Sequence, residues 1–207
     1  MPPKKKARAS RKRMTSSKKK VAARKPAARA RTKRSSAAKK ARAPRIESIP
    51  QQMRWALATK GLTGAYTAIA QVHRDAVGQN GYEDFNAALW YEAGKGAKEL
   101  AQSLGLATET AKDVEAIAHL LASASMGPEF VFEVAQASKD RCVGTTTQCP
   151  WHKRWKEQGL AFDTCSAGHQ AWGDGAVASL NPNFTFKLTK NMVRGDSHCE
   201  WVVERKV

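Results

Sequence analysis

The stretch that decides the fold is TAKDVEAIAHLLASASMGPEFVFEV, residues 110–134. Its first half has the residue spacing of an amphipathic helix. Thr110 followed by Asp113 is the sequence of a capping box, which predicts that a helix begins there. Gly127-Pro128 predicts where this helix ends. Its apolar face is formed by Val114, Ile117, Leu120 and Leu121.

The second half of the stretch changes its period. Phe130, Phe132 and Val134 alternate with polar or smaller residues, which is typical of a strand. Residues 142–147 are then expected to form the returning strand. The same reasoning predicts further helices over residues 151–157 and 166–179, and further strands over residues 184–188 and 199–205.

The residues before this stretch are predicted to be helical. Apolar residues recur at helical spacing over residues 53–77, with Gly61 and Gly64 as a break. The run Gly-Gln-Asn-Gly at residues 78–81 predicts a turn. A second helix over residues 82–104 is expected to bury Phe85, Leu89 and Leu100, with Gly94 and Gly96 at a kink or a close contact.

Helices therefore come first, and strands follow with helices between them. This order predicts an α+β fold in which N-terminal helices precede a small antiparallel sheet with inserted helices. We expect residues 46–207 to form one globular domain, because a segment of this length can bury a core. The most apolar stretch, residues 116–126, is too short to cross a membrane.

Residues 1–45 differ from the rest of the chain in charge. They contain 20 Lys or Arg and no Asp or Glu, whereas residues 46–207 hold 16 basic and 18 acidic residues, a balance of −2. We call residues 1–45 the basic arm. Because it has little apolar surface to bury and repels itself, the basic arm is expected to be disordered.

The basic arm is expected to bind nucleic acid or another polyanion by releasing counterions, with no reading of sequence. It has no aromatic residue that could stack on bases, and its composition resembles the Lys/Ala/Pro tails of linker-histone-like proteins. A solubilising tail is the alternative. The residues expected to contact the polyanion are those of the densest basic blocks, Lys4, Lys5, Lys6, Arg11, Lys12, Arg13, Lys18, Lys19 and Lys20.

No apolar segment follows the basic start, so a secretory signal is not expected. We expect a soluble cytoplasmic protein, associated with the nucleoid in a bacterium or located in the nucleus of a eukaryote. In such a compartment cysteines are reduced thiols or metal ligands more often than disulfides.

All four cysteines and three of the five histidines lie in the last third of the chain. Thiols and imidazoles gathered in this way are used for nucleophilic catalysis or metal binding. Cys149 and His152, followed by Cys165 and His169, copy the spacings of a two-Cys, two-His zinc finger, although the order of the ligand types differs. No cofactor is required by the sequence, and zinc at these four residues is the alternative.

A longer pattern surrounds these cysteines. Cys149-Pro150, Cys165, Asn181-Pro182-Asn183 and Gly195-Asp196-x-x-Cys199 resemble, in order and spacing, the C-terminal signature of the L-2-amino-thiazoline-4-carboxylic acid hydrolase family. The resemblance covers residues 149–201. It implies the hydrolytic opening of a cyclic thiazoline amidine by a hydrolase that acts on non-peptide C–N bonds.

The resemblance also implies the residues of the active site. By family position the candidates are Cys149, Cys165 and Cys199, and we expect Cys165 to be the nucleophile that attacks the amidine carbon. His169, four residues further along a predicted helix, is the candidate base, and a solvated surface role is its alternative. Asp196 is expected either to orient a partner or to serve only the turn that it shares with Gly195.

Cys142 has no counterpart in this pattern and is interpreted as structural. Most of the tryptophans are expected to pack in the core, although they could also line a pocket for a flat ligand. The leading hypothesis is therefore a thiol-dependent hydrolase with a polyanion-binding arm. The alternative is a non-catalytic module that binds a small ligand or a metal and is tethered to nucleic acid by the same arm.

Overall fold

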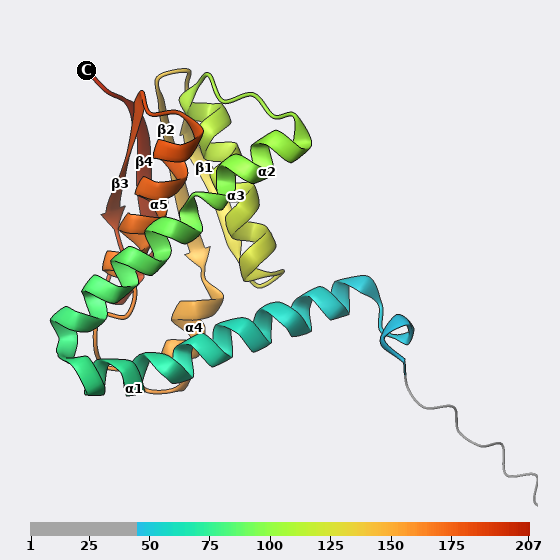
Figure 1. Cartoon of the computed structure of the whole chain (residues 1–207), viewed down its shortest axis with the longest axis vertical. Helices are drawn as coiled ribbons and strands as arrows, with labels where there is room; N and C mark the ends of the chain where they lie inside the picture. Colours follow the sequence, from blue (N-terminus) through green and yellow to red (C-terminus); the bar gives the residue numbers. More distant parts are fainter. Residues whose placement is uncertain (1–44) are drawn as a thin grey trace, which may run out of the picture. The chain divides into compact units, whose positions relative to one another are not determined.

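The computed structural model describes residues 45–207, so the predictions for the basic arm before residue 45 lie outside the described residues. A short 3-10 helix, Ile46–Ser48, leads into the first long helix. The helices are α1 (Gln51–Gly94), α2 (Gly96–Leu104), α3 (Ala111–Met126), α4 (Pro150–Glu157) and α5 (Ser166–Leu180) (Figure 1).

Helix α3 begins and ends where the sequence predicts. Thr110 and Asp113 form the capping box, with the Thr110 hydroxyl oxygen accepting from the Asp113 N–H at 3.1 Å. The helix ends at Gly127, whose φ of 86° lies in a region that favours glycine. These local signals are sufficient because caps act within one turn of the chain.

The strands β1 (Val131–Ala137), β2 (Arg141–Gln148), β3 (Phe184–Lys190) and β4 (Cys199–Arg205) form an antiparallel sheet in the order β1-β2-β4-β3. Helices α4 and α5 lie between β2 and β3 in the chain. The fold is therefore α+β with helices inserted into a small antiparallel sheet, and the predicted fold class is confirmed.

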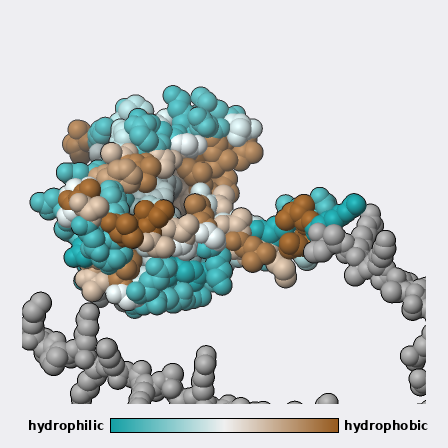
Figure 2. All heavy atoms as spheres, turned by 60° about the horizontal axis from the view of Figure 1, so that its bottom comes forward, coloured by the Kyte–Doolittle hydropathy of each residue, from teal (hydrophilic) through white to brown (hydrophobic). Residues whose placement is uncertain are grey.

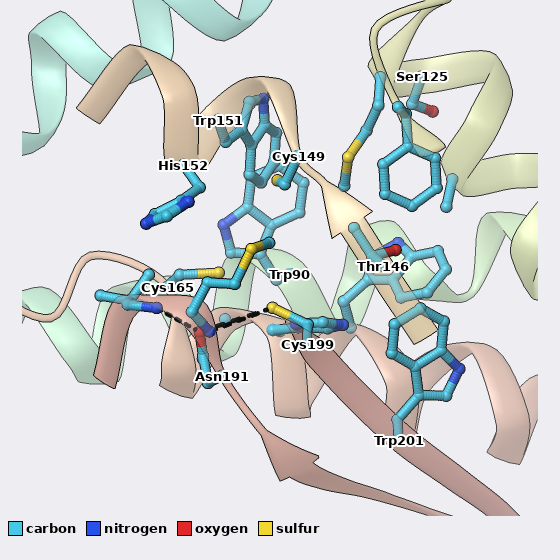
Figure 3. A pocket seen from close by; sticks show the side chains of 18 of the residues that line it. Trp90, Ser125, Thr146, Cys149, Trp151, His152, Cys165, Asn191, Cys199 and Trp201 are labelled. Carbon is cyan, nitrogen blue, oxygen red and sulfur yellow. Dashed lines mark hydrogen bonds between the residues drawn. The ribbon is translucent and has the colours of Figure 1, made fainter. Parts of the chain in front are cut away.

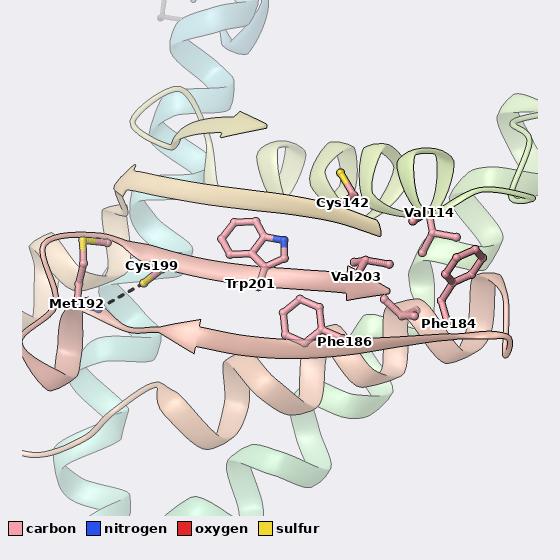
Figure 4. Packing of buried hydrophobic residues seen from close by; sticks show 10 residues of the cluster. Val114, Cys142, Phe184, Phe186, Met192, Cys199, Trp201 and Val203 are labelled. Carbon is pink, nitrogen blue, oxygen red and sulfur yellow. Dashed lines mark hydrogen bonds between the residues drawn. The ribbon is translucent and has the colours of Figure 1, made fainter. Parts of the chain in front are cut away.

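One face of the sheet holds the core. Cys142, Trp201 and Val203 on the central strands point to the same side as Phe184 and Phe186 on β3 (Figure 4). Helices α3 and α5 pack against this side and contribute Ala111, Val114 and Val177 to the cluster. Cys142 is 1% exposed within it, in agreement with a structural role.

The predicted interruptions of α1 are partly wrong. Gly61 and Gly64 do not break the helix. The turn predicted at residues 78–81 falls at Gly78, where φ is 77° and ψ is 172° and the helical conformation is interrupted, so α1 consists of two helical segments that meet there. Glycine favours this conformation because it has no Cβ.

The predicted buried face of α1 is also wrong. Phe85 and Leu89 are 50% and 41% exposed, and Ile69 is 61% exposed. Figure 2 shows such apolar atoms, in brown, at the surface of the described residues. Leu100, in α2, is only partly buried. The side chains that α1 buries are small or polar: Thr59, Thr63, Thr67, Ala70, Tyr82 and Asn86.

The buried threonines of α1 are compatible with the core because their hydroxyls bond to the helix itself. The Thr63 hydroxyl donates to the Thr59 carbonyl at 2.9 Å, and the Thr67 hydroxyl donates to the Thr63 carbonyl at 2.7 Å. Such bonds satisfy a buried hydroxyl without an outside partner. Short side chains at Thr59, Thr63, Thr67 and Ala70 allow other elements to approach this face closely, and Tyr82 is the one large side chain that α1 buries completely.

Helices α1 and α5 approach each other closely. A Cβ at Gly94 would overlap the Trp172 carbonyl oxygen, and a Cβ at Gly175 would overlap the Tyr91 carbonyl oxygen. Glycine at both positions lets the two helix backbones touch. The predicted close contact at Gly94 is therefore confirmed.

Within residues 45–207, no helix combines the length and the apolar character that crossing a membrane requires.

Candidate functional site

A cavity of about 160 Å³ lies between the sheet and the helices α1, α3, α4 and α5. Cys149, Cys165 and Cys199 all line it, whereas Cys142 does not (Figure 3). The structure thus brings the three family-position cysteines to one site. Most of the wall around them is apolar or aromatic.

Cys149 is the N-cap residue of α4, and Pro150 occupies the first position of that helix. The backbone N–H groups of Trp151 and His152 lie close to the Cys149 thiol and lower its pKa, but burial outweighs them and raises the pKa to about 11. The thiol is therefore neutral in the free protein.

Cys165 is the N-cap residue of α5. Asp163, two residues earlier, caps the helix, since its carboxylate accepts from the backbone N–H groups of Cys165 at 3.1 Å and Ser166 at 2.8 Å. Burial raises the pKa of the Cys165 thiol well above its ordinary value, and the other two thiols and Asp163 raise it further.

Cys199 begins β4 and is held by the turn that precedes it. Its thiol accepts from the Met192 N–H at 3.5 Å and donates to the Asn191 side-chain oxygen at 3.8 Å. Burial raises the pKa of this thiol as well. Asp196 does not line the cavity: its carboxylate accepts from the Asn191 N–H at 2.6 Å. Asp196 therefore fixes the residue that holds Cys199.

His169 lines the cavity with Cys165. Its ring lies against Trp201 and Phe186, at centroid distances of 5.5 Å and 6.1 Å. Burial lowers the pKa of His169 to about 4, so the imidazole is neutral at neutral pH. A neutral imidazole can accept a proton, but among the described residues no hydrogen bond joins it to the Cys165 thiol.

His152 also lines the cavity, so all four residues with zinc-finger spacing line it. Residues 45–207 nevertheless contain no group of three or more His, Cys, Asp or Glu side chains arranged to hold a metal ion. The zinc-finger interpretation of Cys149, His152, Cys165 and His169 therefore finds no support in the geometry.

Five of the six tryptophans line the cavity: Trp90, Trp151, Trp155, Trp172 and Trp201. Trp151 stacks on Tyr66 with ring centroids 5.2 Å apart, and the Trp90 N–H donates to the Tyr66 hydroxyl at 2.9 Å. Trp201 and Trp155 are buried, as expected of core residues, and they line the cavity as well. Their rings form the wall of a pocket suited to a flat ligand.

Sequence reasoning missed two residues of α3 that line the cavity, Glu115 and His119. Glu115 is 2% exposed, and both of its carboxylate oxygens accept from the Trp201 side-chain N–H at 3.0 Å. Burial raises the pKa of Glu115 to about 8 and lowers the pKa of His119 to about 4. A possible signal was the position of Glu115 beside Val114 and one turn before His119, on a helix expected to be buried.

Glu115 makes the stability of the fold depend on pH. The pKa of Glu115 is about 8 in the folded protein and 4.5 ordinarily. Between pH 4.5 and about pH 8, Glu115 is therefore protonated in the folded state and ionised in the unfolded state. The stabilisation is complete below about pH 4.5 and is lost as the pH rises through about 8. Relative to Glu115→Gln, the free energy of unfolding of the unmodified protein should fall by up to about 1.4 kcal/mol per pH unit in this window.

Urea unfolding of both proteins at several pH values measures this difference. The comparison cancels the other titrating groups, including His119 and His169, which both proteins contain. Curves that run parallel between about pH 5 and pH 8 would contradict the raised pKa of Glu115.

The comparison with protein families decides where the chain belongs. The profile of the L-2-amino-thiazoline-4-carboxylic acid hydrolase family matches residues 59–202, which is more than half of the chain. The chain belongs to this family. The match includes the three cavity cysteines and both α3 residues, and the resemblance found in the sequence is confirmed.

Two solved structures are similar in fold. The phenol-responsive sensory domain of the transcription activator PoxR, solved with phenol, is 11% identical with a TM-score of 0.50 and covers 69% of this chain and 74% of its own. A trafficking protein particle complex subunit 3 from Naegleria fowleri, covalently bound to palmitic acid, is 15% identical with a TM-score of 0.52. The match covers 73% of this chain and 97% of the subunit. No curated protein matches the sequence. At such identities the likeness concerns the fold alone.

Proposed function

We propose that residues 46–207 are a thiol-dependent hydrolase domain that opens the ring of a small cyclic amidine of the thiazoline type. The observation that carries this proposal is the convergence of Cys149, Cys165 and Cys199 on one largely apolar cavity. Membership of the hydrolase family supports it. The reaction consumes one water molecule.

In the proposed reaction, the Cys165 thiolate adds to the amidine carbon and forms a carbon–sulfur bond. The bond from this carbon to a ring heteroatom then breaks, and the released heteroatom takes up a proton. Water finally displaces the Cys165 sulfur, its oxygen bonding to the carbon, and His169 takes the water proton and returns it to the sulfur, which restores the neutral thiol. His169, neutral at neutral pH, is the group proposed to accept the thiol proton and to deliver it to the released heteroatom.

The raised pKa of the Cys165 thiol sets a condition on this mechanism. A buried thiol ionises readily only when a positive charge enters its surroundings. An amidinium substrate supplies such a charge, so thiolate formation would follow substrate binding rather than precede it.

Loss of the ring tests the proposal. Purified protein would be incubated with L-2-amino-thiazoline-4-carboxylate and, separately, with 2-amino-thiazoline, which lacks the carboxylate. We expect turnover that falls at least about 100-fold in Cys165→Ser, because nucleophilic catalysis is lost. Cys142→Ala is the matched control, since this cysteine lies in the core and not on the cavity.

The outcomes separate the parts of the proposal. Equal turnover in the parent protein and in Cys165→Ser would exclude Cys165 as the nucleophile and direct attention to Cys149 and Cys199. Absence of turnover with both compounds would exclude the proposed hydrolase.

The second candidate is a non-catalytic module that binds a small flat ligand. The raised pKa values of all three cavity thiols favour it, because reactive cysteines ordinarily have lowered pKa values. The similar sensory domain of PoxR was solved with phenol, a small aromatic molecule. The rate at which a disulfide reagent labels the native thiols at neutral pH distinguishes the candidates. The non-catalytic module requires slow labelling with and without 2-amino-thiazoline. The hydrolase requires that labelling become faster when 2-amino-thiazoline is added.

We propose further that the basic arm tethers the domain to nucleic acid or another polyanion. The proposal rests on its 20 basic residues and its lack of acidic ones. The domain itself has a balance of −2 and contributes little to such binding.

A further inference from the structure

Glu115 is a buried carboxyl group with no cation beside it among the described residues. It lies in the middle of α3, is 2% exposed and lines the cavity. The Trp201 side-chain N–H reaches both of its oxygens at 3.0 Å. Gly144 on β2 leaves the room that this pair needs, since a Cβ there would overlap both Trp201 and Glu115.

The charged and titratable groups around Glu115 do not neutralise it. Among residues 45–207, no Lys or Arg side chain lines the cavity and no ion pair includes Glu115. On α3, Lys112 is exposed and His119 is neutral, because its pKa is lowered to about 4. On β2, Cys142 is a neutral thiol, because burial raises its pKa to about 11. On α5, His169 contacts the Trp201 ring and is neutral as well.

The surroundings of Glu115 contain hydrogen-bonding atoms that the protein leaves free. The Thr146 hydroxyl and one ring nitrogen of His119, Nδ1, are buried and have no hydrogen-bond partner among the described residues. Both residues line the cavity. Buried polar atoms of this kind are normally satisfied, so a ligand that bonds to them would gain affinity.

Aromatic rings complete this part of the wall, since Phe130, His119 and Trp201 line the cavity. Behind them, Phe132 stacks on Trp201 with centroids 5.5 Å apart, and His119 stacks on Phe132 at 3.3 Å. Figure 3 shows Trp201 and Thr146 near each other at the edge of the cavity. Faces of aromatic rings attract flat cations, and a buried carboxylate binds a planar N–C–N group through two parallel hydrogen bonds.

We propose that Glu115 binds the amidinium or guanidinium group of the ligand, so that the cavity selects a flat cation over its neutral counterpart. The inference rests on the proposed function and deepens it by naming the charged group of the substrate, but it concerns binding and requires no turnover. Among residues 45–207, the cavity lining offers no Lys or Arg to an anionic ligand that lacks such a group.

Three matched probes test the inference on the full chain. Benzamidine is a flat cation, benzamide is its neutral counterpart and benzoate is its anionic one, and none has a ring bond that the proposed chemistry would open. Titration calorimetry at high salt, which suppresses binding by the basic arm, should show benzamidine binding at least about tenfold more tightly than benzamide, and no binding of benzoate.

Glu115→Gln keeps the size of the side chain and removes its charge. It should weaken benzamidine binding at least about tenfold and leave benzamide binding unchanged. Asp174→Asn is the control, because Asp174 is also partly buried, lies on α5 and does not line the cavity. It should leave the binding of all three probes unchanged.

Proton release gives a second readout. Because the pKa of free Glu115 is about 8, the carboxyl group must lose its proton when the cation binds at neutral pH. The binding heat of benzamidine should therefore vary with the ionisation heat of the buffer, and this variation should vanish in Glu115→Gln. This readout uses the unmodified protein and remains available if the Gln variant does not fold.

Equal affinities for benzamidine and benzamide, or benzamidine binding without proton release, would overturn the inference. Unchanged benzamidine affinity in a folded Glu115→Gln protein would do the same. Selective binding of benzamidine without ring opening of 2-amino-thiazoline would uphold the inference and exclude only the hydrolase. Ring opening that is insensitive to Glu115→Gln would uphold the hydrolase and exclude the role of Glu115.

Discussion

Substitution of Gly175 by alanine is expected to destabilise the domain by about 3 kcal/mol or more. The added Cβ would overlap the Tyr91 carbonyl oxygen on α1, and backbone cannot move aside as the end of a flexible side chain can. The two helices would have to separate along their whole contact. Urea unfolding followed by circular dichroism measures the change in the free energy of unfolding.

Gly64→Ala provides the control, with an effect of opposite sign. Gly64 lies within α1, and nothing lies within 4 Å of the position that its Cβ would take. Alanine there should stabilise the protein by about 0.5–1 kcal/mol, because it loses less backbone entropy on folding. If Gly175→Ala instead remained within about 0.5 kcal/mol of the parent protein, the close crossing of α1 and α5 would be wrong.

Binding of the full chain to duplex DNA of arbitrary sequence should fall at least about 1,000-fold between about 50 and 200 mM salt. The reason is that the basic arm carries 20 positive charges, and each charge that contacts a phosphate releases a counterion. Fluorescence anisotropy of a labelled duplex over a salt series measures this dependence. Replacing the nine residues of the densest basic blocks, Lys4, Lys5, Lys6, Arg11, Lys12, Arg13, Lys18, Lys19 and Lys20, by Gln should lower both the affinity and the salt slope.

A shuffled arm of the same composition is the control for this experiment. It should bind with the same affinity and the same salt slope, because counterion release depends on charge and not on order. A marked preference for one DNA sequence, or a loss of binding on shuffling, would show that the arm reads more than charge.

Local signals in the sequence determined much of the fold. The capping box of Thr110 and Asp113 and the stop at Gly127 place α3 correctly, because each acts within a turn or two. The alternation of Phe184 and Phe186 places β3 and its inward face, because successive side chains of a strand point to opposite sides. The order of these elements then gave the α+β class.

The signature around the cysteines determined the family, and the structure places Cys149, Cys165 and Cys199 on one cavity. Part of that signature serves the fold instead. The Asn181 side chain donates to the Thr108 carbonyl at 2.7 Å and accepts from the Asn183 N–H at 3.0 Å. A motif therefore identifies the relatives of a chain without separating residues that react from residues that hold the fold.

The buried face of α1 was decided only by the tertiary structure. Ile69 and Phe85 follow helical spacing yet face outward, because α1 packs through short side chains such as Thr63 and meets α5 at Gly175. The periodicity of one helix reveals that it has two faces. Which face is buried depends on the shape of the elements packed against it.

Glu115 shows the same limit at the site. In the sequence it is one acidic residue within a helix, of the kind that ordinarily faces solvent. The tertiary structure brings to it Trp201 and Thr146, from strands far apart in the chain, beside His119 of its own helix, and no cation among residues 45–207. The sequence by itself determined the elements, the family and the cationic character of the arm, since these depend on neighbouring residues and composition. The tertiary structure alone decided which side chains share a cavity and in what charge state, because burial and pairing are properties of residues brought together by the fold.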